Sequence, residues 1–415
     1  MFEATAPDIP HVALFVFIPF CKIKCTYCDF NAYANLARVM KPYADAVARE
    51  IERTATPTRP HARTLYFGGG TPSIVPVAHI EKILRACQQS FALDPDAEIT
   101  LEANPGTVDL DKLRALRALG VNRLSLGVQS FDDATVQRLN RGHTVADAAQ
   151  TYELARRAGF DNINLDFIYG LPLQTLAGWR ATLERAIALA PEHLSLYALK
   201  VEEGTGLEFQ IARGKYPMPD DDLAADMYEL AEEMLAAAGY EQYEISNWRL
   251  EVRSWKLEVG SSKLEVPAPS PISNLQLPTS NFQSRHNLTY WQNEPYLGFG
   301  AGAHSYFGGV RYWNVLSPVE YIARIERGES VVAGREEIGR ELEMAETMFL
   351  GLRLNEGVSF ERFQGRFGED VRVKYQKQLG ELRELELIRV SDERVWLTSR
   401  GRLLSNEVFW RFLPE

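Results

Sequence analysis

The segment Ile18-Pro19-Phe20-Cys21-Lys22-Ile23-Lys24-Cys25-Thr26-Tyr27-Cys28-Asp29-Phe30 contains three of the four cysteines of this 415-residue chain. It directly follows an apolar stretch that ends at Ile18, which predicts a buried strand leading into a loop. Three thiolates in one short loop suit a cubane iron–sulfur cluster, because its irons need several sulfur ligands that converge from one side. Three protein ligands leave one iron open, and an open iron can hold a small molecule and do chemistry on it.

The alternatives for these cysteines are a zinc knuckle, a disulfide and buried apolar side chains. A structural zinc site needs four ligands, and neither a fourth cysteine nor a histidine follows nearby. Disulfides pair evenly and belong to oxidising compartments. The chain begins Met1-Phe2-Glu3 without a basic, apolar leader, and its early apolar runs are too short to span a membrane. We therefore expect a reduced, cytoplasmic protein, in which the isolated Cys87 is a packing residue.

Length and charge narrow the class of protein. A chain of this length should hold two or three domains, each able to bury its own core. The formal net charge is −11. Because phosphate binding needs a basic face, this charge argues against nucleic acid as a main partner.

Residues 10 to 245 alternate short apolar runs with longer helical patterns. Buried strands that are each followed by a helix predict a parallel sheet with right-handed crossovers. Six such units predict an α/β fold with a partial (β/α)6 barrel of the TIM type, whose functional residues gather at the carboxyl ends of the strands. The predicted strands are 14–18, 64–67, 98–102, 123–128, 162–167 and 193–199, and the predicted helices are 39–55, 77–91, 109–119, 145–158, 175–189 and 221–238.

Polar residues and glycines follow the predicted strands. The run Gly68-Gly69-Gly70-Thr71-Pro72 comes after the second strand, where missing side chains let backbone amides approach a ligand. Asp166 lies inside an apolar strand, and a carboxylate there is costly to bury without a partner, which favours a functional role. Each of these residues also has a purely structural explanation. The glycines could form a turn, Glu102 could cap a loop, and Arg141 could form an ion pair at a helix end. Their joint placement with Gln129 at strand ends indicates one common site.

The CxxxCxxC spacing after a first strand, with an aromatic residue just before the last cysteine, resembles the radical S-adenosylmethionine (SAM) superfamily. In that superfamily the amino and carboxylate groups of SAM chelate the open iron of a [4Fe-4S] cluster, and the reduced cluster can cleave SAM to a 5′-deoxyadenosyl radical. The resemblance therefore implies Cys21, Cys25 and Cys28 as cluster ligands, with SAM as a second cofactor.

The chain is similar, over nearly its whole length, to the branch that includes oxygen-independent coproporphyrinogen III oxidase and the haem chaperone HemW. This resemblance implies that Gly69, Gly70 and Thr71 meet the methionine end of SAM. It also implies that the carboxylate, sulfonium, ribose or adenine of SAM meets the remaining polar side chains, which are Glu102, Gln129, Arg141 and Asp166.

Local departures from the family pattern bear on the choice of function. The oxidase carries a further cysteine two positions after the triplet, whereas this chain has Asp29-Phe30, as HemW does. Phe15 stands where the family usually has a tyrosine near SAM, and Phe17 where it usually has a histidine. Phe15 can pack against SAM but cannot donate an O–H. The first strand also starts almost at once, without the long N-terminal region expected of the oxidase, and both points favour the chaperone.

The run His286-Asn287-Leu288-Thr289-Tyr290-Trp291 matches the HNxxYW pattern that the resemblance associates with haem binding. An imidazole can ligate haem iron while nearby aromatic side chains pack on the porphyrin. The alternative is a histidine that forms local hydrogen bonds inside an aromatic core. On the basis of the resemblance, we expect His286 to ligate haem iron, and His304 is the alternative ligand.

The segment 249–283 is unusual in composition. Arg249-Leu250-Glu251-Val252, Lys256-Leu257-Glu258-Val259 and Lys263-Leu264-Glu265-Val266 repeat at a spacing of seven. The apolar residues of each repeat lie two apart, which does not suit a coiled-coil seam. We interpret 249–283 as a low-complexity insertion, a surface loop or weak hairpin without a chemical role. It separates a barrel with the cluster and SAM site, 1–248, from a haem-binding and connecting region, 284–340.

The last part of the chain, 341–415, predicts a winged-helix-like α+β domain. Helical patterns at 343–352, 358–366 and 370–384 precede short strands at 387–390 and 395–398, and a last helix starts near residue 399. Such folds often bind DNA, but this segment has 12 basic and 14 acidic residues. Because its net charge is negative, we expect it to dock a protein partner or to cover the barrel mouth.

Two functions from different classes remain open. A haem chaperone would hold haem near His286 and transfer it to an acceptor apoprotein, with the cluster and SAM regulating or enabling release. An oxygen-independent coproporphyrinogen III oxidase would instead abstract hydrogen from two propionate side chains of its substrate, giving vinyl groups and carbon dioxide. The residues and the resemblance favour the chaperone, with no more than transient membrane contact.

Overall fold

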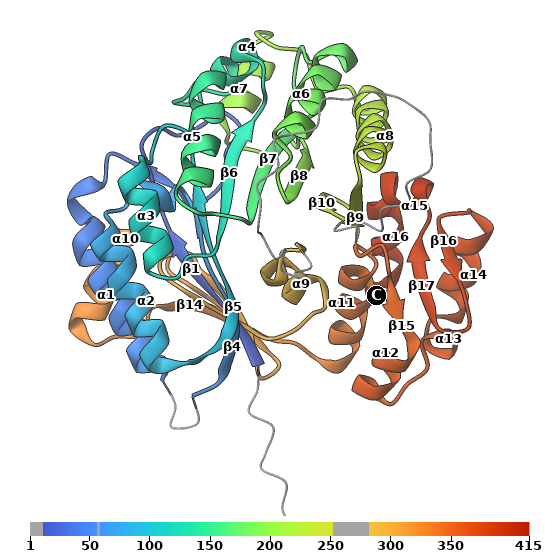
Figure 1. Cartoon of the computed structure of the whole chain (residues 1–415). Helices are drawn as coiled ribbons and strands as arrows, with labels where there is room; N and C mark the ends of the chain where they lie inside the picture. Colours follow the sequence, from blue (N-terminus) through green and yellow to red (C-terminus); the bar gives the residue numbers. More distant parts are fainter. Residues whose placement is uncertain (1–10, 56–58, 252–281, 415) are drawn as a thin grey trace, which may run out of the picture.

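A mixed sheet of twelve strands organises most of the chain in the computed structural model, which describes residues 11–55, 59–251 and 282–414. Its middle is parallel, and the six strands predicted from the sequence all lie there (Figure 1). In sheet order they are β1 (His11–Ile18), β4 (His61–Gly69), β5 (Ala92–Ala103), β6 (Arg123–Gln129), β7 (Ile163–Tyr169) and β8 (His193–Ala198).

The crossover helices lie on the outside of the curved sheet (Figure 1). Helix α5 shows how local sequence sets their limits: the hydroxyl of Thr144 accepts from the backbone N–H of Asp147, and the Asp147 carboxylate accepts from the N–H of Thr144. Two further helices are short: α4 (Asp133–Arg138), which the sequence predicts between β6 and Asn140-Arg141-Gly142, and α7 (Gly206–Ala212), which was not predicted. The predicted helices are α1 (Met40–Thr54), α2 (Val77–Ser90), α3 (Leu110–Ala118), α5 (Val145–Arg157), α6 (Leu176–Leu189) and α8 (Asp221–Ala237).

The sheet extends beyond the six predicted strands on both sides. Strand β11 (Tyr296–Phe299) pairs in parallel with the free side of β1, so a segment from beyond residue 284 extends the barrel wall. Strands β14 and β9 end the sheet and do not pair with each other, so the barrel is open. The other added strands are antiparallel: β12 (His304–Phe307), β13 (Val310–Asn314), β14 (Val332–Glu337), β10 (Asn247–Leu250) and β9 (Tyr240–Glu244).

One hydrophobic core joins the two sides of the segment 249–283. It includes residues from Val12 to Val331. Helix α10 (Pro318–Arg327) follows β13 and packs beside α1 (Figure 1). The greater part of the predicted insertion, with two of its three repeats, lies outside the described residues.

A buried glutamate ties the late strands to the first helix. Glu50 of α1 accepts hydrogen bonds from the backbone N–H of Gly300 at 2.8 Å and from the hydroxyl of Tyr321 at 2.5 Å. Its other oxygen accepts from Nδ2 of Asn314 at 2.7 Å. Burial raises the pKa of Glu50 to about 7, although each of the three donors favours the ionised form.

The C-terminal part of the chain has its own core, from Met344 to Phe412. Its strands form a separate antiparallel sheet in the order β15-β17-β16. The predicted helix 370–384 is broken at Tyr375. The elements are α11 (Arg340–Gly351), β15 (Val358–Ser359), α12 (Phe360–Phe367), α13 (Val371–Lys374), α14 (Gln376–Glu384), β16 (Ile388–Val390), β17 (Arg394–Leu397), α15 (Ser399–Leu403) and α16 (Ser405–Phe409).

The linker between α11 and β15 joins the C-terminal domain to the edge of the barrel sheet. The backbone N–H of Ile245 donates to the carbonyl of Arg353 at 3.1 Å, and the N–H of Asn355 donates to the carbonyl of Tyr243 at 2.9 Å. Glu244 and Leu354 form a β-bridge between these two bonds. The predicted fold class, a partial α/β barrel with a winged-helix-like C-terminal domain, is confirmed. No helix in the described parts of the chain has the length and apolar character needed to cross a membrane.

We predict that Glu50→Gln changes how stability depends on pH. In the wild type the folded carboxyl has a pKa of about 7, against an ordinary value of 4.5. The folded state therefore keeps a proton that the unfolded chain releases, and the wild type loses stability as the pH rises through this window. Relative to the variant, its free energy of unfolding should fall by roughly 1–3 kcal/mol between about pH 5 and about pH 8, as guanidinium denaturation can measure.

The matched control is Glu52→Gln, because Glu52 is exposed on the same helix. A free-energy difference between wild type and Glu50→Gln that stays constant over this pH range would contradict the prediction.

Candidate functional site

The three clustered cysteines lie in the loop that leaves the carboxyl end of β1. All three are free, partly exposed thiols. The loop is held by backbone bonds to two short helices: the N–H of Thr26 donates to the carbonyl of Leu139 after α4 at 3.1 Å, and the N–H of Leu207 in α7 donates to the carbonyl of Thr26 at 2.7 Å. A short parallel pair, β2 (Phe20–Cys21) and β3 (Tyr33–Ala34), closes the loop.

A cavity of about 360 Å³ opens beside this loop at the carboxyl ends of the strands. Its lining includes Cys21, Cys25 and Cys28. Seven of the eight residues predicted to meet SAM also line this cavity. They come from β4, β5, β6, β7 and the segment after α4. They are Gly69, Gly70, Thr71, Glu102, Gln129, Arg141 and Asp166.

Arg141 connects the cysteine loop with the strand ends. Its Nη1 lies 3.4 Å from Sγ of Cys25, and its Nη2 donates to Oδ1 of Asn104 and to the carbonyl of Gly127, both at 2.6 Å. Burial raises the pKa of the Cys28 thiol to about 11, so iron binding there must displace a proton.

Two carboxyl groups face the cavity with different partners. Glu102 accepts from the Tyr66 hydroxyl at 2.8 Å and from the N–H of Gly69 at 3.1 Å. Burial raises the pKa of Glu102 to about 7. Asp166 accepts from Ser125 Oγ at 2.9 Å and from Asn164 Nδ2 at 2.8 Å, and burial raises its pKa also. Each carboxyl keeps acceptor capacity for a ligand in the cavity.

Steric constraints explain why glycine occupies these positions after β4. A Cβ on Gly70 would lie 2.7 Å from the carbonyl oxygen of Phe20, and Gly69 has a φ of 112°, which disfavours other residues. Gln129 also has a positive φ, 68°, at the end of β6. Strained non-glycine backbone of this kind persists where the surroundings fix it and is concentrated at functional sites.

Phe15 lies apart from the other predicted SAM residues. Its ring stacks on Tyr66 at 5.8 Å and on His286 at 5.9 Å between ring centroids. It does not appear among the residues that line the cavity. Its contact with SAM stays a prediction.

His286 is the second residue of helix α9 (Arg285–Trp291), which lies between the barrel strands and the C-terminal domain (Figure 1). The side chain is 1% exposed. Its Nδ1 is hydrogen-bonded to Thr64 Oγ1 at 2.8 Å, and its Nε2 to the Tyr290 hydroxyl at 2.9 Å. Burial lowers the pKa of His286 to about 3, so the ring is neutral. To ligate iron, His286 must lose one of these bonds and become accessible. The reserve residue, His304, is exposed on β12 and stacks on Trp313.

Sequence reasoning assigned no role to several residues of this cavity. Asn104 donates to Thr71 Oγ1 at 3.0 Å, and Asn287 of the HNxxYW motif reaches the cavity from α9. Arg123 is 2% exposed in β6, and its Nε has no hydrogen-bond partner among the described residues. A charged residue within an apolar strand is the same signal that singled out Asp166, so Arg123 could have been found in this way.

The donor set fits a polynuclear cluster. Among the described residues, no three His, Cys, Asp or Glu side chains come together as ligands of one metal ion. A mononuclear zinc knuckle would need such an arrangement. A cubane cluster instead spreads its ligands over several irons, and three thiols around one cavity, with a guanidinium at one sulfur, match that requirement.

Comparison with known sequences and structures agrees with this geometry. The profile of the radical SAM superfamily matches residues 15–186, and that of the HemN C-terminal domain matches residues 340–404. A Bacillus subtilis protein named heme chaperone HemW is 36% identical over 97% of this chain and 99% of its own length. A bovine mitochondrial protein named radical S-adenosyl methionine domain-containing protein 1 is 33% identical over 87% of this chain and 77% of its own length.

The solved structure of coproporphyrinogen III oxidase (HemN) from Escherichia coli, a radical SAM enzyme, superimposes with a TM-score of 0.79. It covers 98% of this chain and 91% of the oxidase at 23% identity, a level that shows a shared fold. The chain spans nearly the full length of the Bacillus protein, and the cysteine loop, the strand-end cavity and the C-terminal domain all lie within the matched region. The chain therefore belongs to the HemW family of the radical SAM superfamily.

Proposed function

We propose that this protein binds haem and transfers it to an acceptor protein, with a SAM-binding [4Fe-4S] cluster in its barrel. The observation that carries the proposal is the end-to-end similarity to relatives named heme chaperone HemW. Phe30, which occupies the position of the oxidase's further cysteine, supports it. The side chain is 61% exposed and lines the cavity beside the cluster loop.

In this proposal Cys21, Cys25 and Cys28 hold the cluster, and the cavity beside them holds SAM. When reduced, a cluster of this kind supplies the electron that cleaves the sulfonium of SAM. The chain itself contributes position: Gly69 and Gly70 hold the turn after β4 against the cysteine loop, and the guanidinium of Arg141 lies beside Sγ of Cys25. The polar side chains that orient SAM are Thr71, Glu102, Gln129, Arg141 and Asp166.

For haem we propose iron ligation by His286, with His304 as the alternative. His286 lies in the HNxxYW segment but is held on both ring nitrogens. Haem binding would therefore require α9 to release the ring. His304 needs no such movement, because it is exposed. A haem-accepting apoprotein in the cytoplasm is the expected partner, with transient membrane contact at most.

We predict that the anaerobically reconstituted protein binds haem and does not decarboxylate coproporphyrinogen III. The cluster is loaded with iron and sulfide, and the same preparation is divided between a haem titration and an assay for vinyl products in the presence of SAM. Robust vinyl-porphyrin formation would show that the oxidase alternative is right and the chaperone proposal wrong.

We predict that Cys25→Ser prevents stable cluster assembly, because only two thiolates then remain in the loop. Iron and sulfide content should fall by most of the wild-type value, together with the visible absorption of the cluster. Cys87→Ala is the matched control, because Cys87 is buried in the barrel core away from the cavity. Equal cluster content in Cys25→Ser and wild type would contradict the assignment.

We predict that His286→Ala weakens haem binding and shifts the haem absorption spectrum. Tyr290→Phe removes the hydroxyl that occupies Nε2 of His286, so it should strengthen haem binding through this ring. Cluster content serves as the control for folding. If His286→Ala leaves the spectrum and the affinity unchanged while His304→Ala alters both, the ligand is His304.

A further inference from the structure

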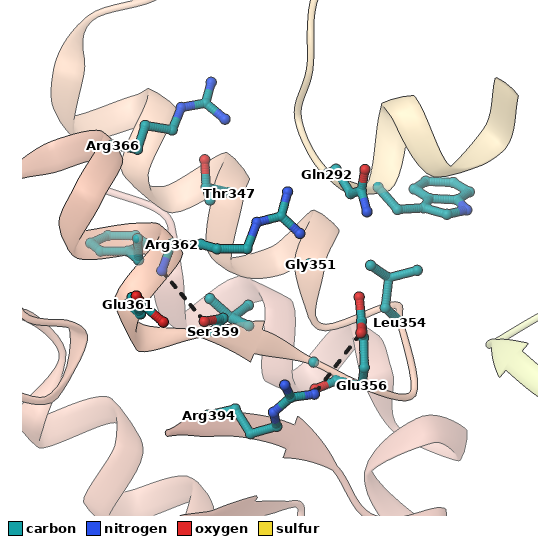
Figure 2. A pocket seen from close by; sticks show the side chains of 14 residues that line it. Gln292, Thr347, Gly351, Leu354, Glu356, Ser359, Glu361, Arg362, Arg366 and Arg394 are labelled. Atoms are coloured by element: carbon teal, nitrogen blue, oxygen red, sulfur yellow. Dashed lines mark hydrogen bonds and ion pairs between the residues drawn. The ribbon is translucent and has the colours of Figure 1, made fainter. Parts of the chain in front are cut away.

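A second cavity lies on the C-terminal side of the HNxxYW helix, away from the cysteines. Its volume is about 280 Å³, near the lower end of small-molecule sites. Figure 2 shows that its walls come from several elements: Gln292 follows α9, Thr347 and Gly351 belong to α11, and Arg362 and Arg366 belong to α12. It is thus a site built where the barrel meets the C-terminal domain.

One wall of this cavity is apolar and aromatic. Trp291, the last residue of the HNxxYW motif, lines it together with Leu354 and Phe363. The guanidinium of Arg353 lies 4.2 Å from the centre of the Trp291 ring. The indole Nε1 of Trp291 has no hydrogen-bond partner among the described residues. Arg353 covers one face of the indole and Nε1 is buried, so Trp291 offers a ligand the rest of its apolar surface and no open donor.

The cavity lining also includes three arginines, Arg362, Arg366 and Arg394. Arg366 is fixed, because it donates to Glu343 Oε1 at 2.6 Å and to the carbonyl of Asn293 at 2.9 Å.

The other two arginines are only loosely paired. Arg362 lies 3.8 Å from a carboxylate oxygen of Glu294, and Arg394 lies 3.9 Å from one of Glu356. Both distances exceed a hydrogen bond. Nη1 of Arg394 also donates to the backbone carbonyl of Glu356 at 3.3 Å. In Figure 2 the Arg362 side chain extends from α12 toward Gln292 and Leu354. Most of the guanidinium donors of Arg362 and Arg394 therefore remain open for a ligand.

Two arginines of the lining can receive an anion. Arg366 is already paired with Glu343, and Arg362 and Arg394 face Glu356 and Glu361 without a net excess of charge. The open donors of Arg362 and Arg394, and not a net positive charge, favour an anionic group here. Arginine forks bind carboxylates with two parallel hydrogen bonds. None of the lining residues is His, Cys or Met, the side chains that usually ligate haem iron. The cavity suits a molecule with a planar apolar body and carboxylate arms, and it recognises the arms rather than a metal.

We propose that this cavity binds the propionate edge of haem, with Arg362 and Arg394 on the carboxylates and Trp291 beside the ring. The inference rests on the proposed haem-binding function. The cavity is too small for a whole porphyrin, so the iron lies outside it. Helix α9 separates Trp291 from His286, which is buried against the barrel strands, so one haem could contact both only after α9 has released the His286 ring as proposed above. The carboxylates and the iron are thus recognised by different parts of the protein.

The test compares hemin with hemin dimethyl ester, which has the same ring and iron but no ionised propionates. Each is titrated into the reconstituted full-length protein, the Arg362→Gln/Arg394→Gln double variant and an Arg389→Gln control. Arg389 is exposed in the same domain and does not line the cavity. For hemin, the double variant should bind roughly tenfold to a hundredfold more weakly than wild type, with an unchanged Soret maximum.

For the ester, wild type and double variant should bind equally, because the carboxylates that the arginines recognise are gone. The side chains of Arg362 and Arg394 are 63% and 41% exposed, so the double variant should fold, and cluster content verifies this. Equal binding of hemin by wild type and double variant, or an equal loss for hemin and ester, would overturn the proposal while leaving haem binding intact. Absence of hemin binding to wild type would overturn the proposed function itself.

Discussion

Parallel strands joined by right-handed crossovers bring all their carboxyl ends to one edge of the sheet, and the rest of this protein depends on that constraint. The cysteine loop leaves β1 at this edge, and the glycine run, Glu102, Gln129 and Asp166 leave the neighbouring strands at the same edge. Because the strands are held about 5 Å apart by backbone hydrogen bonds, residues from five separate chain segments line one cavity. Arg141 then links the cysteine loop to the strand ends, because it contacts both Cys25 and Asn104.

The sequence predicted the parts of the fold whose signal is local. Six strands were found because each is a buried apolar run followed by a helix, and the cavity residues were found because they follow those runs. Strands β11 to β14 were missed because they have four to six residues each. Their place in the sheet depends on a pairing with β1 across more than 280 residues. The burial of His286 could not be predicted from the sequence either, because its hydrogen-bond partner Thr64 is 222 positions away in the chain. Local pattern can identify a polar residue, but only the folded chain supplies its partners.

The HNxxYW helix separates two environments. Asn287 reaches the cavity that holds the cysteines, whereas Trp291 lines the cavity on the C-terminal side. His286 and Tyr290, one turn apart, are packed among Phe15, Tyr66 and Tyr296. The backbone N–H groups of Arg285 and His286 donate to the buried Glu98, which fixes the start of the helix on β5. One short segment therefore contacts the cavity beside the cysteines, the barrel strands and the C-terminal domain, and a ligand that moves it would affect all three.

The bonds between β9 and residues 353–355 also bear on the solubility of the chain. An unpaired edge strand is a template for pairing with another copy, and proteins protect such edges with charge, bulges or a covering segment. Here the linker between α11 and β15 covers the end of the barrel sheet with two backbone hydrogen bonds and a bridge. A fragment that stopped before α11 would keep every cavity residue near the cysteines yet leave β9 uncovered. The C-terminal domain thus removes part of the β9 edge from pairing with another copy of the chain.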